Sequence, residues 1–442
     1  NMELFIQISQ FVLSLSILII LHELGHMLPA KYFKTKVEKF YLFFDAGFSL
    51  FKFKKGETEY GIGWIPLGGY VKIAGMIDES MDKEQMKDPA KPWEFRSKPT
   101  WQRLIIMVGG VTVNLLLGFL IYIMILFVWG KDYVPNEAIK YGAHLSNTKF
   151  ADYGFQEGDL IVEVGGSTIN EFGDATSKIL IDGERELKIR RQDQIIPVTL
   201  NDSIVTDLLR LKVRGIFSDI RFPNIIDSVM KGSFAELANL QRGDSVVGIN
   251  GQSTPYYLDF KREIERYESE EVELQIIRNE KPETIKVQVA EDHTIGYFPK
   301  NQFLYFDYKH KDYGLMESIP TGVSEGVTTL GNYVKSLGLL FNKEGAKQIG
   351  GFGTIGGLFS PYWDWKRFWS MTALLSIILA FMNILPIPAL DGGHVMFLIY
   401  EMISGKPPSD QFLTRAQIVG MSLLLALLVY ANGMDIYRWI SG

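Results

Sequence analysis

Two histidines and a glutamate near the N-terminus have the spacing of a metal site. His22, Glu23 and His26 form the pattern H-E-L-G-H within an apolar run that begins near Phe11. On a helix, residues four positions apart lie on one face, so both imidazoles point to the same place. This is the H-E-x-x-H arrangement in which two histidines bind zinc and the glutamate acts as general base. The cluster therefore predicts metal-dependent hydrolysis.

The apolar surroundings of this cluster strengthen the functional interpretation. Ionisable side chains at membrane depth cost free energy, so they mark a functional site by default. The alternative is a helix capped by polar residues at the membrane surface. The i, i+4 spacing of the two histidines favours a hydrolytic site within the membrane.

Composition narrows the class of protein. The chain has 442 residues, of which 47% are hydrophobic and 22% charged, which suggests a few membrane spans joined to a sizeable soluble part. A net charge of -6 gives no indication of a nucleic-acid partner. Because there are no cysteines, disulfides and thiolate ligands are excluded, and a metal must be held by His, Asp, Glu or water.

Four segments are long and apolar enough to span a bilayer, which requires about 20 residues. They cover residues 4–28, 104–129, 368–390 and 416–434, and the first contains the histidines. The fold class predicted is a polytopic α-helical membrane protein with four transmembrane helices, its membrane core formed by residues 1–132 and 367–442. No basic region or small-residue cleavage site flanks the first span, so we do not expect a removable signal peptide.

Basic residues between the first two spans indicate the orientation. They lie at both ends of that connection: Lys31, Lys34, Lys36, Lys39, Arg96, Lys98 and Arg103. By the positive-inside rule, residues 31–98 are cytoplasmic, whereas both termini and the stretch from about 131 to 366 lie outside. In a bacterial cell this predicts a multi-pass protein of the cytoplasmic (inner) membrane with a periplasmic or external region.

The external region contains an internal repeat. Residues 158–166 begin with Gly-Asp and end in Gly-Gly, and residues 243–251 begin with Gly-Asp and end in Asn-Gly. Both runs alternate β-branched residues before a tight turn, which indicates strands and hairpins. The spacing of about 85 residues suits one small β domain per repeat. The alternative to the assignment below is another small β fold.

The repeated pattern resembles tandem PDZ domains, expected at residues 133–220 and 221–292. PDZ domains bind an extended peptide end by adding it to a sheet edge. The sequence leaves open whether these units bind peptide ends or act only as a steric cover. Residues 293–366 are expected to form a linker with an amphipathic surface segment near 315–341.

The cytoplasmic loop has a strand-like pattern between residues 47 and 73. Aromatic and β-branched residues alternate there with lysines and glycines, which predicts membrane-associated β-hairpins with glycine turns. Such strands enter a membrane only where protein shields their backbone groups. The alternative is a small cytoplasmic sheet.

The metal site needs one further protein ligand, because catalytic zinc sites use three plus a water. Asp391 follows the long uncharged run of the third span and requires a partner at that depth. Pro386 and Pro388 interrupt helical hydrogen bonding just before it. His394 is the competing ligand. The sequence favours Asp391.

Together these motifs resemble the site-2 protease family. The resemblance is carried by H-E-L-G-H in the first span and N-x-x-P-x-P-x-L-D-G-G over residues 383–393. The two PDZ-like units between spans two and three are similar to its bacterial regulator-of-sigma-E protease branch. The resemblance implies one zinc ion bound by His22, His26 and Asp391, with Glu23 as catalytic base.

The same resemblance implies roles in substrate binding. Asn383 and Pro386 match family positions implicated in holding an unwound substrate. Asn114 ends a G-x-x-x-N element near the site, for which simple helix packing through a small residue is the alternative. Apart from the resemblance, an edge strand from residues 47–71, with Gly61 and Gly63 as its candidate residues, is expected to hold the substrate extended by β-addition.

The implied activity is a metalloendopeptidase in regulated intramembrane proteolysis. Its expected partners are the lipid bilayer and single-span membrane proteins such as anti-sigma factors or remnant signal peptides. The PDZ pair would exclude proteins with bulky external domains. A catalytically inactive PDZ-bearing scaffold is the main alternative, against which the intact set of four site residues argues. A metal-linked transporter is a further alternative.

Overall fold

The computed structural model describes residues 2–66, 68–76, 89–213, 215–341 and 350–441. These form two compact units, which are considered separately. The membrane unit comprises residues 1–130, 312–337 and 346–442. The β unit comprises residues 131–311 and 338–345.

The predicted spans are confirmed as four helices long and apolar enough to cross a membrane. They are α1 (Met2–Tyr32), α2 (Thr100–Trp129), α10 (Trp365–Ile384) and α12 (Asp410–Ser441). The third helix ends at Ile384, earlier than residue 390, because the prolines at 386 and 388 cannot continue it. A new helix, α11 (Asp391–Ser404), then begins.

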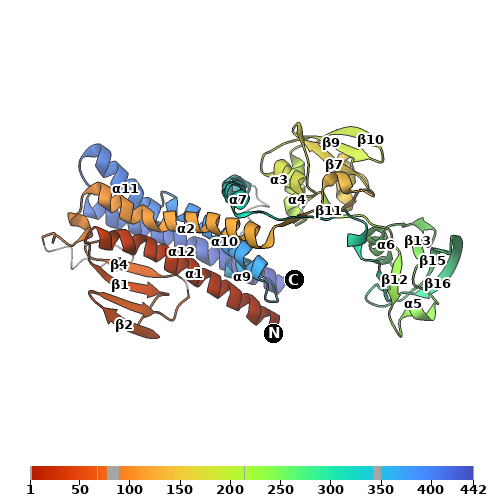
Figure 1. Cartoon of the computed structure of the whole chain (residues 1–442), viewed down its shortest axis with the longest axis horizontal. Helices are drawn as coiled ribbons and strands as arrows, with labels where there is room; N and C mark the ends of the chain where they lie inside the picture. The colour runs from red at the N-terminus through yellow and green to blue at the C-terminus, as the bar shows by residue number, and fades with distance from the viewer. Residues whose placement is uncertain (1, 67, 77–88, 214, 342–349, 442) are drawn as a thin grey trace. The chain divides into compact units, whose positions relative to one another are not determined.

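Helices α1, α2 and α10 pack side by side (Figure 1). Small and hydroxylated residues let them approach closely. Ser14 of α1 hydrogen-bonds Thr372 of α10 across 2.9 Å, with both side chains fully buried. In α2, a Cβ on Gly109 would lie 1.9 Å from the Gly25 carbonyl oxygen of α1. Such contacts replace the hydrophobic driving force that is missing between helices in lipid.

Two further helices belong to the membrane unit. Helix α7 (Leu315–Ser336) lies within the segment predicted to be amphipathic, and its Gly322 packs against Ile123 of α2. Helix α9 (Phe352–Gly356) is capped by Asp435 of α12, whose carboxylate accepts hydrogen bonds from the backbone N–H groups of Gly351 and Thr354.

A four-stranded sheet forms between α1 and α2, where β-hairpins were predicted. Its strand order is β2-β3-β1-β4, with β1 and β3 parallel. The sheet therefore contains one hairpin, β2-β3, and begins before residue 47. The strands are β1 (Val37–Leu42), β2 (Phe51–Lys55), β3 (Thr58–Ile62) and β4 (Tyr70–Ile73).

The predicted repeat is present in the β unit as two lobes with the same strand order. The first lobe contains the sheet β10-β9-β7-β8, and the second contains β16-β15-β13-β14. The elements of the first sheet are β7 (Leu160–Val164), β8 (Ser167–Thr168), α3 (Asp174–Leu180), β9 (Glu186–Arg191) and β10 (Gln194–Thr199). Those of the second are β13 (Ser245–Ile249), β14 (Gln252–Ser253), α6 (Tyr257–Ile264), β15 (Glu271–Arg278) and β16 (Lys281–Gln288).

Further elements complete each lobe. In the first lobe β6 (Ala143–Leu145) pairs with β11 (Phe217–Ile220), and α4 (Ser203–Arg210) packs into its core. In the second lobe β12 (Ile226–Val229), followed by α5 (Phe234–Leu237), pairs with β17 (Tyr297–Pro299). The second lobe thus extends beyond residue 292, where the sequence placed its end. Outside both sheets, β5 (Lys131–Tyr133) pairs with β18 (Lys309–Lys311).

The repeated Gly-Asp pairs have a structural role in the lobes. Asp159 is fully buried, forms an ion pair with Arg191 at 2.8 Å, and accepts a hydrogen bond from a backbone N–H of its own turn. Asp244 does the same with Arg278 in the second lobe, at 2.6 Å. Each carboxylate fixes the turn that starts the central strand, because a buried charge must be paired and hydrogen-bonded.

Candidate metal centre

Three side chains predicted to bind a metal converge in the membrane unit. The Nε2 atoms of His22 and His26 lie 3.2 Å apart. The Asp391 Oδ2 atom lies 3.2 Å from His22 Nε2 and 3.3 Å from His26 Nε2. The three candidate donor atoms therefore form a nearly equilateral triangle, although Asp391 is more than 360 positions from the histidines in sequence.

This triangle fits a tetrahedral zinc ion. Ligand atoms about 2 Å from such an ion lie about 3.3 Å from one another. Asp391 Oδ2 is buried and makes no hydrogen bond, as expected for an atom reserved for a cation. Two imidazoles and a carboxylate are the donor set of a catalytic zinc site with one open position. The residues present thus fit the metal that the motif predicts.

A backbone contact fixes the orientation of His26. Its Nδ1 atom lies 2.8 Å from the carbonyl oxygen of Ile106 in α2. A carbonyl only accepts, so Nδ1 carries the proton and Nε2 remains free to bind a metal. This outer contact is typical of zinc-binding histidines.

Asn114 lies beside the Nδ1 atom of His22, as the Ile106 carbonyl lies beside that of His26. Its side-chain amide lies 3.3 Å from His22 Nδ1, and the side chain is almost fully buried. With the amide nitrogen toward the ring, the Asn114 Oδ1 atom has no partner. If the amide is rotated by 180°, Oδ1 accepts a hydrogen bond from a protonated His22 Nδ1. The Nε2 atom of His22 is then unprotonated and can bind a metal. Asn114 is therefore placed to orient His22, one of the predicted metal ligands.

The close crossing of α1 and α2 depends on Gly110. A Cβ at this position would lie 2.3 Å from His26 Nε2 and 2.7 Å from His22 Cε1. No larger side chain fits without moving the imidazoles. The G-x-x-x-N element thus serves both helix packing, which the sequence left as an alternative, and the orientation of the histidines.

The turn between α10 and α11 positions Asp391. The next two residues, Gly392 and Gly393, pack tightly against the backbone of residues 384–388. A Cβ on either glycine would lie 2.6 Å or less from that backbone. On the other side, Gly420 of α12 packs directly against the Pro388 carbonyl. Asp391 begins α11, where the positive end of the helix dipole favours a carboxylate.

A cavity of about 650 Å³ adjoins the three ligand positions. Glu23 lines it and is only 9% exposed, so its carboxylate is shielded from bulk solvent beside the ligand cluster. His394 also lines the cavity. The group of side chains whose donor atoms are close enough to hold one metal ion consists of His22, His26 and Asp391. Among the described residues, the geometry favours Asp391 as third ligand and Glu23 as the nearby base.

The residues predicted to bind substrate are distributed unevenly around this cavity. Asn383 and Asn114 line it, and the Asn383 amide lies 3.5 Å from His22 Nε2. Pro386 is not among the lining residues and instead ends the third span. Gly61 and Gly63 are also absent from the lining.

The free sheet edge at the cavity is β4, not the strand that contains Gly61. Strand β3 is flanked on both sides, by β2 and β1. A Cβ on Gly61 would strike the Tyr41 ring at 2.4 Å, and one on Gly63 would strike the Phe44 carbonyl at 2.1 Å, so both glycines serve packing. Among the described residues, strand β4 pairs only with β1, and its four residues line the cavity.

Strand β4 passes close to the predicted base. A Cβ on Gly69, just before the strand, would lie 2.5 Å from Ile19 of α1 and 3.6 Å from the Glu23 Cγ atom. The backbone N–H of Val71 faces the Glu23 carboxylate. Sequence reasoning missed this contact, although the Gly68-Gly69 pair marked a close backbone approach.

Fold and site together define a membrane metalloendopeptidase of the site-2 protease type. The model of peptidase family M50 matches residues 10–427, and the chain belongs to this family. It is 27% identical to the regulator of sigma E protease of Haemophilus influenzae, with 98% of each chain covered. It is 26% identical to RseP of Escherichia coli, again over 98% of each chain, and 24% identical to the metalloprotease MmpA of Caulobacter vibrioides, over 97% of this chain and 96% of the relative.

Proposed function

We propose that this protein hydrolyses peptide bonds within the membrane segments of single-span proteins, such as anti-sigma factors or remnant signal peptides. The proposal is carried by one observation: the His22, His26 and Asp391 donor atoms form a zinc-sized triangle, and both histidines belong to a helix apolar enough to span a membrane. A protease with its site at that depth acts on substrates that enter the bilayer. The names of its sigma-E relatives agree with a role in regulated intramembrane proteolysis.

The chain's own residues have defined roles in this reaction. His22, His26 and Asp391 hold one zinc ion, which when bound polarises the scissile carbonyl and lowers the pKa of water toward about 7. Glu23 accepts the proton of the attacking water and returns it to the leaving amine. Asn383, at the mouth of the ligand cluster, offers an amide to the backbone groups that an unwound substrate exposes.

The location of the cut tests this function directly. Purified protein is incubated in detergent with a single-span model substrate, and the products are sized by mass spectrometry. We expect cleavage within the apolar segment, loss of cleavage with a zinc chelator, and recovery when zinc is returned. Cleavage confined to the soluble flanks, or unchanged by the chelator, would contradict the proposal.

Strand β4 is the proposed substrate-holding edge. A helical substrate hides its carbonyls in backbone hydrogen bonds, so it must become extended before attack. An unpaired strand edge provides the N–H and C=O groups that an extended peptide needs. The free edge of β4 lines the cavity beside Glu23, which supports this role.

Val71→Pro tests the role of β4, because proline removes the backbone N–H that faces the site. We expect cleavage to fall at least about tenfold, corresponding to one lost hydrogen bond at the site. Val71→Ala, which keeps the N–H, and Phe53→Pro on the opposite edge strand β2 are the matched controls. Cleavage by Val71→Pro within twofold of the parent would exclude substrate addition at β4.

The two lobes of the β unit are proposed to be PDZ-like and to lie outside the cytoplasmic membrane, with residues 31–98 on the cytoplasmic side. The basic residues of that loop support the orientation. The duplicated strand order supports a common fold for both lobes. Because the chain has no cysteine, labelling of single introduced cysteines by an impermeant reagent on whole cells decides the sidedness.

A further inference from the structure

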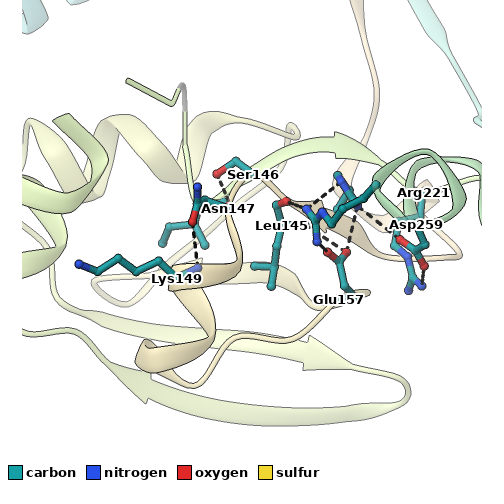
Figure 2. A network of polar contacts seen from close by, with 10 residues as sticks. Leu145, Ser146, Asn147, Lys149, Glu157, Arg221 and Asp259 are labelled. Carbon is teal, nitrogen blue, oxygen red and sulfur yellow. Dashed lines mark hydrogen bonds and ion pairs between the residues drawn. The ribbon is translucent and has the colours of Figure 1, made fainter. Parts of the chain in front are cut away.

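A cluster of charged side chains lies where the two lobes of the β unit meet. His144 and Glu157 belong to the first lobe, Asp259 and Arg262 belong to helix α6 of the second, and Arg221 lies on the segment between them. Figure 2 shows Glu157, Arg221 and Asp259 within one connected network of polar contacts. None of these residues has a part in the metal centre.

Arg262 reaches from the second lobe to three groups of the first. Its Nη1 atom donates to Glu157 Oε1, and its Nη2 atom donates to the Leu145 carbonyl. The same Nη2 atom lies 2.9 Å from His144 Nε2. One guanidinium thus spans the junction, and it uses the fork of donors that only arginine provides.

Asp259 connects the lobes in the opposite direction. One oxygen, Oδ2, accepts from Arg221, and the other lies 3.4 Å from His144 Nδ1. Glu157 Oε2 lies 3.1 Å from the same Nδ1 atom. His144 is only 9% exposed, so these interactions are shielded from water and salt.

Aromatic contacts accompany the polar ones. The Arg221 guanidinium stacks 3.9 Å from the centre of the Tyr256 ring, and Tyr256 packs against Tyr141 of the first lobe with ring centres 5.7 Å apart. A Cβ on Gly158 would lie 2.4 Å from Arg221 Nη1, so the guanidinium fills the space that this glycine leaves. The junction between the lobes therefore combines ion pairs with the packing of aromatic rings.

The cluster is better suited to ion pairing than to binding a metal. Donor atoms of His144, Glu157 and Asp259 do lie within 4.8 Å of one another. However, the guanidinium groups of Arg221 and Arg262 hold the other carboxylate oxygens and already balance both negative charges. Burial alone would lower the pKa of His144, but hydrogen bonds with Asp259 and Glu157 outweigh it and raise that pKa, so a proton competes for the imidazole.

We propose that these five side chains form a joint that holds the two lobes as one body, with Arg262 as its main connection. The segment between the lobes, residues 221–225, is short, and the ion pairs of the joint further restrict the relative orientation of the lobes. With the joint, both lobes present their surfaces at a fixed distance from each other. A ligand or partner that separates the lobes must break these ion pairs.

The distance between the lobes in the full-length protein tests the joint. Because the chain lacks cysteine, spin labels can be placed at two introduced cysteines, at the exposed positions Ile195 in the first lobe and Leu237 in the second. Pulsed spin-resonance spectroscopy then gives the distribution of label distances. We expect one narrow distribution in the parent and at least a doubling of its width in Arg262→Met. Arg266→Met is the matched control, because Arg266 bonds Glu263 within the second lobe.

Further variants separate loss of the joint from unfolding. Labels at Leu237 and Ile277, both in the second lobe, should keep one distance in every variant. If that pair also broadens in Arg262→Met, the distance between the lobes is measured in Glu157→Gln instead, because this variant removes the negative charge with which Arg262 pairs in the first lobe. An unchanged distance between the lobes in both variants would overturn the proposal. A second zinc per chain that is lost in Asp259→Asn would overturn it in favour of a metal site.

Discussion

Glu23→Gln is expected to abolish proteolysis while leaving the zinc content unchanged. Glutamine keeps the size of the side chain but cannot accept the proton of the attacking water. A positioned general base contributes about 10²- to 10⁴-fold to a rate, and we expect a loss of that order. Glu23 lines the cavity but is not one of the three donor atoms of the metal triangle, so metal binding should persist.

Asp391→Ala is the companion variant, and it should lose both proteolytic activity and bound zinc. Removing the carboxylate leaves two imidazoles, too few protein ligands for a catalytic zinc site. Zinc per chain, measured by elemental analysis, and cleavage of a single-span substrate give the two readouts. Parental cleavage by Glu23→Gln would point to another base or to a contaminating protease. Full zinc content in Asp391→Ala would exclude Asp391 as a ligand.

Gly110→Ala should disable the site without replacing any of the predicted metal-binding or catalytic side chains. The added methyl group would lie 2.3 Å from His26 Nε2 and 2.7 Å from His22 Cε1, closer than any van der Waals contact allows. Overpacking of this kind costs about 1–3 kcal/mol, and the imidazoles must turn or the helices must separate. A displacement of about 1 Å at a reacting centre can cost about 100-fold in rate.

We therefore expect Gly110→Ala to lose at least about 100-fold in cleavage and to bind zinc more weakly. Zinc retention during titration with a competing chelator measures the second effect. Thr112→Ala is the matched control, because Thr112 lies on the same helix, is exposed, and hydrogen-bonds only the Val108 carbonyl of its own helix. Equal zinc retention and cleavage in Gly110→Ala and Thr112→Ala would show that the crossing tolerates a methyl group.

Much of the site could be predicted because its signals are local. His22 and His26 share a helix face whatever surrounds that helix, so their spacing alone brings them together. Asp391 stands out as a carboxylate after an uncharged span, where it needs a cation. The Gly-Asp repeat likewise predicted two similar lobes, and the same buried ion pair in each explains it.

The sequence placed the proposed substrate edge within residues 47–71 but did not indicate which strand forms it, because strand order is a long-range property. Alternation of apolar residues predicts that a segment is a strand but not which neighbour it pairs with. Gly61 and Gly63 suggested an open edge, yet β1 joins β3 in parallel and leaves β4 free. The end of the second lobe was misplaced for the same reason, since β17 pairs with a strand about 70 residues earlier.

The sequence by itself determined the chemistry: two histidines, a glutamate and an aspartate at membrane depth, with no thiolate to compete. Only the tertiary structure decided how these residues are held. The Gly110 crossing and the contacts of Asn114 and Ile106 with the imidazoles unite segments far apart in the chain. In the β unit, the contact of Arg262 with Glu157 does the same. Spacing within one helix is set by covalent geometry, whereas such contacts exist only after the helices and strands have packed.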